Sequence, residues 1–277
     1  MEVIIISETG PELQDIQGEV DRRAVGLNCV GIRDFKLPLK VKDRNRGTQN
    51  VVADVNIGVN LSADERGAHL SRFVELAEKY RQSKFSFESV SNFLNDLTEN
   101  LNSTNAYASF EFDYFIEKSS PSSDKKGLMD FRCGFGGLLK EGEMKTWVSA
   151  EVPLTTLCPC SKENSRGGAH NQRAVVKSKA VINRLIWLEE FIELIEGEGS
   201  SQLYSLLKRE DEAYVTEQAY NNPKFVEDIV RDLSLVFEEE ERIGDFLLEC
   251  ISYESIHNHN AYATVRRGDF WEEATSL

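Results

Sequence analysis

The chain has 277 residues, of which 40% are hydrophobic and 29% charged, enough apolar material for two average domains or one large α+β domain. Its formal net charge of −15 argues against a nucleic-acid coat or an anionic membrane surface as a partner, because both require a basic footprint. No run approaches the roughly 20 apolar residues of a membrane span, and the first residues lack the basic start of a signal peptide. We therefore expect a cytoplasmic protein without nucleic-acid or membrane partners.

The first half of the chain predicts two strands, two helices and two further strands. Residues 1–18 show little periodicity and predict a flexible arm, and an irregular strand is expected within 22–39. Alternation over 51–59 predicts a half-buried strand, and apolar residues at 70, 73, 74 and 77 predict a helix. A second helix over 87–101 precedes strands at 106–114 and 128–135, which flank a Ser- and Pro-rich turn.

The same order of elements recurs in the second half. Strands are expected at 144–152 and 174–182, followed by a helix from Leu188 that ends at Gly197. Asn222 and Pro223 are suited to be the N-cap and first residue of another helix, before strands at 246–251 and 261–265. The pattern predicts an α+β fold of two ββααββ modules, 19–140 and 141–277, with antiparallel sheets backed by helices.

The cysteines are odd in number and too few for a disulfide framework. Cys133 and Cys250 lie in apolar strand-like runs and are expected in the core. Cys158 and Cys160 instead lie in a polar, glycine-containing stretch that predicts a loop, with His170 twelve residues after Cys158. A thiolate and an imidazole suit Zn²⁺ and similar ions, although two ligands leave such a site incomplete. The alternative is a polar loop with incidental cysteines.

Other reactive side chains gather in three further places. Arg173, Lys177 and Lys179 share one face of the predicted strand, where they are either solvated or available to a phosphate. Glu254 precedes His257 and His259 at a strand end, a plausible set for acid–base chemistry. A histidine and an arginine three residues apart open the first helix and suit either an anion clamp or an ordinary surface (His69 and Arg72).

Several common site motifs are absent from the sequence, including the GxxxxGK[ST] and GxGxxG nucleotide fingerprints, HExxH and the base-deaminase signature. The charge and Cys/His pattern alone therefore favours a metal-assisted hydrolase of an anionic substrate. A more specific indication comes from five motifs in a fixed order, namely GAHLSRF (67–73), CPCSKE with GAHNQR (158–173), KREDEAYVTEQAY (208–220), NPKFVEDIVRD (222–232) and ESIHNHNAYA (254–263).

This ordered set resembles GTP cyclohydrolase type IB, a prokaryotic enzyme family of the tunnelling fold (T-fold). The resemblance implies ββααββ modules that assemble through their sheets into a barrel-like homotetramer. It also implies conversion of GTP and water to 7,8-dihydroneopterin triphosphate and formate, the first step towards tetrahydrofolate and a queuosine precursor. Most of the active site is then expected in the second module.

Site residues follow from the same resemblance, position by position. Cys158, His170 and Glu212 match the ligands of one divalent ion per subunit, which we expect to be Zn²⁺, Mn²⁺ or Fe²⁺. Glu254 matches the carboxylate that anchors the purine, and His257 matches the proton-transfer residue. The remaining expectations are a second active-site thiol and a neighbouring histidine, Cys160 and His259, and four triphosphate contacts, Arg173, Lys177, His69 and Arg72.

Two alternatives of other classes remain open on the sequence. A T-fold nitrile reductase dependent on NADPH also uses a thiol and a purine-anchoring glutamate, but it needs a nicotinamide site and no metal ligands. A non-catalytic metal-binding assembly protein would bind the ion and leave GTP unchanged.

Overall fold

Two ββααββ units follow each other along the chain, as the hydrophobic patterns predict, with a few short elements added. The computed structural model describes residues 14–271, so most of the predicted N-terminal arm lies outside the described residues. The first unit comprises β1 (Leu27–Asp43), β2 (Gly47–Leu61), α1 (Leu70–Arg81), β3 (Lys84–Phe85), α2 (Phe87–Leu101), β4 (Ala106–Ser119) and β5 (Lys126–Lys140).

The second unit has the same framework with two extra helices and one short strand. It comprises β6 (Glu143–Leu157), α3 (Pro159–Asn164), β7 (Asn171–Ile182), α4 (Leu188–Glu196), β8 (Ser201–Gln202), α5 (Arg209–Asn221), α6 (Val226–Glu239), β9 (Ile243–Ser252) and β10 (Ala261–Arg267). No helix within residues 14–271 has both the length and the apolar character needed to cross a bilayer.

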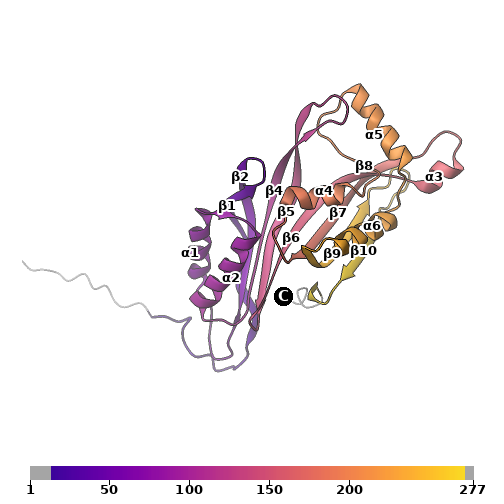
Figure 1. The fold of residues 1–277 in the computed structure, drawn as a ribbon. Coiled ribbons are helices and arrows are strands. Elements are labelled where there is room, and N and C mark those ends of the chain that lie inside the picture. Colours follow the sequence, from indigo (N-terminus) through magenta and orange to yellow (C-terminus); the bar gives the residue numbers. More distant parts are fainter. Residues whose placement is uncertain (1–13, 272–277) are drawn as a thin grey trace, which may run out of the picture.

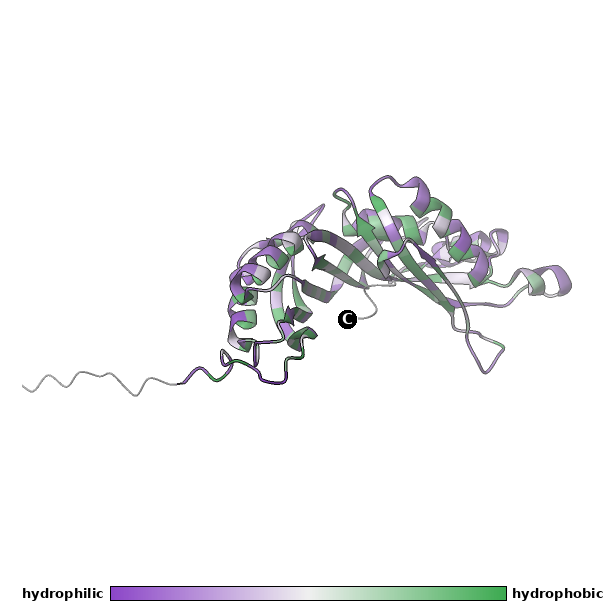
Figure 2. Cartoon of the chain, turned by 90° about the horizontal axis from the view of Figure 1, so that it is seen from below, coloured by the Kyte–Doolittle hydropathy of each residue, from purple (hydrophilic) through white to green (hydrophobic). Residues whose placement is uncertain are grey.

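The two units share one continuous sheet rather than forming a sheet each. Its order is β10-β9-β7-β6-β5-β4-β2-β1-β3, with β8 beside β6, and only the short β1–β3 pairing is parallel. β5 and β6 form a hairpin from Arg132↔Glu151 to Lys140↔Glu143, which carries the sheet across the boundary expected near residue 140. The sheet is curved, and helices α1, α2, α4 and α6 lie on one of its faces, whereas α3 and α5 lie at one end of the sheet (Figures 1 and 2).

The core between the sheet and the helices also runs through both units. Aromatic rings form its centre in each unit: Phe110 lies 4.6 Å from Phe85 and 5.3 Å from Phe93 between ring centroids. Phe237 in the second unit lies 5.4 Å from both Phe191 and Phe246. All six of these phenylalanines are at most 2% exposed, as the period-2 and period-3.6 patterns require of core-facing positions.

Polar contacts join the two units inside this core. The Tyr114 hydroxyl on β4 donates to the Glu189 carboxylate on α4 at 2.8 Å. The Lys118 ammonium pairs with Glu196 at 2.5 Å and also donates to the Leu203 carbonyl at 2.9 Å. Because buried charges are costly without partners, these contacts favour the relative placement of the two units in which Lys118 and Glu196 are paired.

A second apolar cluster covers the helix-free face of the sheet. It contains Leu138, Trp147, Val181, Phe270 and Trp271, so the last described residues fold back onto β5, β6 and β7. A Cβ atom on Gly136 would lie 2.3 Å from the Trp147 ring, which explains why glycine occupies this position opposite Trp147.

Two local expectations need correction. Asn222 does not begin a helix: its N–H donates to the Gln218 and Ala219 carbonyls and ends α5, after which Pro223 cannot continue the helix. α6 instead begins at Val226, where the Asp228 carboxylate accepts from the Phe225 N–H at 3.0 Å. The segment after Cys158 is a short helix, α3, rather than a loop.

The start of α5 is fixed by one buried carboxylate, Asp211. It is 0% exposed and accepts four hydrogen bonds of 2.6–2.8 Å, from the Ser122 and Ser123 amides, the Ser123 hydroxyl and the Lys208 amide. Burial alone would raise the pKa of Asp211, but these donors together hold it well below its usual value. Asp211 therefore anchors α5 to the β4–β5 turn.

We predict that Asp211→Asn lowers the melting temperature at neutral pH, because the amide places an NH₂ group where backbone donors converge. A depressed native pKa stabilises the fold above the unfolded-state value of about 3.9 and loses this effect as the pH falls further. The difference in melting temperature from the wild type should therefore be constant near neutrality and shrink below about pH 4. Asp130→Asn, an exposed β5 position, is the control and should show no such pH-dependent difference.

Candidate active site

Five of the side chains predicted to be functional line one pocket at an end of the sheet. The pocket has a volume of about 260 Å³ and receives side chains from the ends of β6, β7 and β9 and from the start of α6. Its predicted members are Cys158, His170, Glu254, His257 and His259, and its other lining residues are Thr156, Gln172, Lys224, Phe225, Val226, Glu227, Ser252 and Ala261.

Strand pairing explains why Cys158 and His170 meet. Leu157 at the end of β6 pairs with Asn171 at the start of β7, so the flanking residues lie side by side and the Cys158 N–H donates to the His170 carbonyl at 3.2 Å. Helix α3 lies in the segment between Cys158 and His170 and contacts both residues. Its Ser161 amide donates to Cys158 Sγ at 3.4 Å, and its Ser161 hydroxyl accepts from the His170 N–H at 3.1 Å.

Glu254 reaches the same place from β9. Ser252 pairs with Ala174 of β7, and the Tyr253 N–H donates to the Arg173 carbonyl at 2.9 Å, which extends the ladder towards the pocket. One carboxylate oxygen of Glu254, Oε1, accepts from the Ser252 hydroxyl at 3.0 Å and from the Gln172 side-chain amide at 3.3 Å. No hydrogen bond to the other oxygen is recorded among the described residues, and a ligand in the pocket can use it.

His257 and His259 follow on an exposed segment that bends over the pocket. Their rings stack with centroids 5.1 Å apart and an interplanar angle of 16°. Residues 255–259 form bends and not the extended segment that was expected, but both rings line the pocket and are exposed to solvent.

One chain brings together two of the three predicted metal ligands. Cys158 and His170 supply a thiol and an imidazole, a donor pair that fits Zn²⁺ and similar ions. Glu212 is exposed in the first turn of α5, whereas α3 contacts the other end of that helix through a 2.6 Å bond from Lys162 Nζ to the Tyr220 carbonyl. Within residues 14–271, no group of three His, Cys, Asp or Glu side chains is placed to hold a metal.

The cysteines divide into two environments. Cys133 and Cys250 are buried in the core, as predicted, and burial raises the pKa of the Cys250 thiol to about 12, so it remains protonated. Cys158 is partly exposed at the pocket, and Cys160 is exposed on α3, outside the pocket lining. Cys158 is therefore the cysteine placed to act as a ligand.

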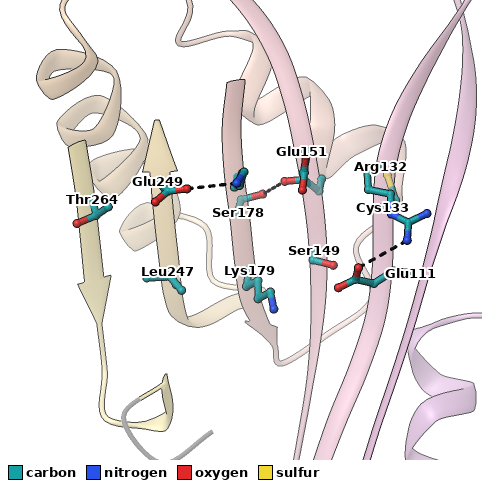
Figure 3. A pocket seen from close by; sticks show the side chains of 12 residues that line it. Glu111, Arg132, Cys133, Ser149, Glu151, Ser178, Lys179, Leu247, Glu249 and Thr264 are labelled. Atoms are coloured by element: carbon teal, nitrogen blue, oxygen red, sulfur yellow. Dashed lines mark hydrogen bonds and ion pairs between the residues drawn. The ribbon is translucent and has the colours of Figure 1, made fainter. Parts of the chain in front are cut away.

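The predicted cationic residues of β7 lie on the opposite face of the sheet from the pocket. Lys177 and Lys179 line a hollow on the helix-free face, where Lys177 pairs with Glu249 at 3.5 Å (Figure 3). Arg132 pairs with Glu111 in the same hollow at 3.7 Å. Strand alternation accounts for this arrangement. Gln172 points to the face that carries the pocket, so the odd-numbered residues Arg173 and Lys177 point to the opposite face.

His69 and Arg72 lie in the other unit of the chain. His69 precedes α1, with Nε2 3.5 Å from the Asp15 carboxylate, and Arg72 donates to the Asn100 carbonyl at 3.1 Å. Neither residue lines the pocket at Cys158. One chain thus does not bring them to the site, and their role as triphosphate contacts stays a prediction.

Gln172, Ser252 and Lys224 line the site but are not among the predicted residues. The sequence could have indicated Gln172, because it lies two positions after His170 at the start of a strand, and residues two apart in a strand share one face. Lys224 pairs with Glu198 at 2.9 Å and Asp232 at 2.8 Å, contacts between distant segments that no local pattern indicates.

Comparisons with known proteins agree with these motifs. The sequence profile described as "Type I GTP cyclohydrolase folE2" matches residues 13–263. GTP cyclohydrolase FolE2 of Halorhodospira halophila is 43% identical over 255 residues, covering 92% of this chain and 98% of the relative. The FolE2 protein of Thermosipho africanus is 44% identical over 253 residues, covering 91% and 97%.

Among solved structures, the fold is similar to that of uricase from Arthrobacter globiformis. The TM-score is 0.52 at 10% sequence identity, and the match covers 90% of this chain and 98% of the uricase chain. This likeness concerns the fold alone and supports the expected α+β tunnelling architecture.

We predict that Cys158→Ala abolishes most divalent-metal binding while the protein keeps its melting temperature, because this thiol is the predicted ligand and lines the pocket without being part of the core. Bound Zn²⁺ per chain, measured after dialysis by elemental analysis, tests this. Cys160→Ala, which removes the same thiol outside the pocket lining, is the matched control and should retain the metal. Full occupancy in Cys158→Ala would remove this thiol from the ligand set.

Proposed function

The chain belongs to the type I GTP cyclohydrolase FolE2 family, and from this premise we propose that it converts GTP and water to 7,8-dihydroneopterin triphosphate and formate as a metal-dependent type IB enzyme. The product is a precursor for tetrahydrofolate and queuosine. The observation that carries the proposal is the convergence of Cys158, His170, Glu254 and His257 on one pocket. Neither the nitrile reductase nor the non-catalytic alternative is supported by the relatives.

Glu254 is the residue that recognises guanine in this proposal. A carboxylate accepts hydrogen bonds and donates none, which complements the N1–H and exocyclic amine along one edge of guanine. Ser252 and Gln172 hold Oε1 from the protein side and thereby fix the plane of the carboxylate. The base then enters with its donors towards Glu254 and its imidazole ring towards Cys158 and His170.

Cys158 and His170 hold the divalent ion, with Glu212 proposed as the third ligand. When bound, Zn²⁺, Mn²⁺ or Fe²⁺ supplies an acidified water for attack at C8 of the purine. His257 lines the same pocket, and we assign it to deliver a proton to the departing ring nitrogen, with His259 stacked beside it. Cys160 lies on α3, two positions after Cys158, and is proposed as a second active-site thiol.

A homotetramer would complete this site. Glu212, His69 and Arg72 lie away from the pocket within one chain, and about 260 Å³ is less than the 300–1,000 Å³ typical of small-molecule sites. The sheet ends in strand edges that are open among the described residues, β10 at one side and most of β1 at the other. Exposed apolar side chains accompany these edges, including Leu27 and Tyr262, at 46% and 70% exposure. Pairing of such edges between copies would cover them.

The proposed activity is tested by incubating the purified protein with GTP and Mn²⁺ or Zn²⁺ while pterin fluorescence and formate are measured. Both products should appear together. Metal binding without formate release would favour the non-catalytic alternative.

We predict that Glu254→Gln weakens GTP binding by about 1–3 kcal/mol, because an NH₂ group would then face the donors of guanine. Equilibrium binding of GTP to the metal-free protein measures this without turnover. Glu143→Gln makes the same change at the exposed turn between β5 and β6 and should leave the affinity unchanged. Equal GTP affinity in wild type and Glu254→Gln would contradict the anchor role.

We also predict that Tyr262→Lys on β10 shifts the protein from tetramers to smaller species, because a charge on an open edge opposes pairing with another strand. Multi-angle light scattering should give about four times the 31.4 kDa mass of one chain for the wild type, and a lower mass for the variant. Val74→Lys, at an exposed position of helix α1 and not on a strand edge, is the control. An unchanged mass in Tyr262→Lys would argue against assembly through β10.

A further inference from the structure

Gln172 connects the two functional groups of the pocket. Its Oε1 lies 2.9 Å from Nδ1 of His170, and its Nε2 donates to Oε1 of Glu254 at 3.3 Å. The Ser255 hydroxyl lies 3.4 Å from both His170 Nδ1 and Gln172 Oε1. A single side-chain amide therefore links the metal-ligand histidine to the purine-binding carboxylate.

The chemistry of these groups fixes the direction of every bond in this chain. A carboxylate has only acceptors, so Gln172 must present its NH₂ group to Glu254. The carbonyl oxygen of the same amide then faces His170, and a carbonyl can only accept. His170 must consequently carry its proton on Nδ1, which leaves the Nε2 lone pair available for a metal ion.

The same carboxylate oxygen of Glu254 also accepts a hydrogen bond from the interior of the protein. The Ser252 hydroxyl that donates to Glu254 lies 3.4 Å from the Thr156 hydroxyl, and these two residues are 1% and 2% exposed. Gln172 thus links the Glu254 carboxylate, which these buried hydroxyls support, to the imidazole of His170. If this link is removed, Glu254 keeps one donor, whereas His170 loses the short contact that selects its tautomer.

We propose that Gln172 is a positioning residue that sets the tautomer of His170 for metal binding and orients Glu254 for the purine. The proposal deepens the function proposed above and rests on it for the roles of His170 and Glu254. It follows that metal affinity depends on the side-chain oxygen of Gln172, which accepts from His170. GTP affinity depends on the side-chain NH₂ group, which donates to Glu254.

The two halves can be separated by substitution. Gln172→Met keeps the length and removes both hydrogen bonds, and we predict a 10- to 100-fold loss of Zn²⁺ affinity, the usual effect of removing such an orienting partner. GTP affinity of the metal-free protein should fall by about tenfold, because a hydrogen bond to a charged group is lost. Zn²⁺ affinity is measured by chelator competition, and GTP affinity by calorimetry without metal.

Gln172→Glu preserves an acceptor for His170 but replaces the donor that faces Glu254 with a second carboxylate oxygen. It should retain Zn²⁺ affinity within about twofold of the wild type, while GTP binds more weakly. Gln49→Met, at a glutamine that bonds only the Phe115 backbone, is the matched control and should change neither affinity. All variants should show the wild-type melting curve.

The proposal is overturned if Gln172→Met binds Zn²⁺ like the wild type, or if Gln172→Glu loses Zn²⁺ to the same extent as Gln172→Met. The second result would assign Gln172 a packing role only. These outcomes are distinct from failure of the proposed function, which appears as absent formate release by the wild type.

Discussion

The register of the β6–β7–β9 ladder determines where Cys158, His170 and Glu254 of the candidate site lie. Backbone pairing of Leu157 with Asn171 and of Ala174 with Ser252 brings three strand ends to one corner of the sheet. Cys158, His170 and Glu254 each lie within two residues of a paired position, so little freedom remains in their separation. A shift of one residue in either pairing would turn the functional side chains to the other face.

That strict alternation also separates two kinds of chemistry. Hydroxyl and amide groups that are hydrogen-bonded to one another gather on the helix side, where Thr156 and Ser252 are buried. The long charged side chains of β7 lie on the helix-free face and pair with acids such as Glu249. Two surfaces of opposite character thus share the same strands, and each keeps its polar groups satisfied.

The sequence predicts the element order, the α2 helix, the core cysteines and the convergence of five pocket residues, because these depend on local periodicity and on short motifs. It does not predict the single sheet, because the expected boundary between the modules falls in the turn between β5 and β6, and the alternation within each strand does not indicate whether the two strands pair across that turn. The sequence places the start of α6 too early, because Asn222 and Pro223 suit the end of one helix as well as the start of the next. The face taken by Lys177 relative to the pocket depends on where β7 begins, which composition alone does not indicate.

The aromatic cluster on the helix-free face has a spectroscopic consequence. The chain has three tryptophans, and two of them, Trp147 and Trp271, lie 5.8 Å apart between ring centroids, with Phe270 5.8 Å from Trp147. Both indoles are at most 4% exposed. Intrinsic emission from this pair therefore reports whether the segment at 270–271 is seated against the sheet, and it offers an optical signal from a surface remote from the Cys158 pocket.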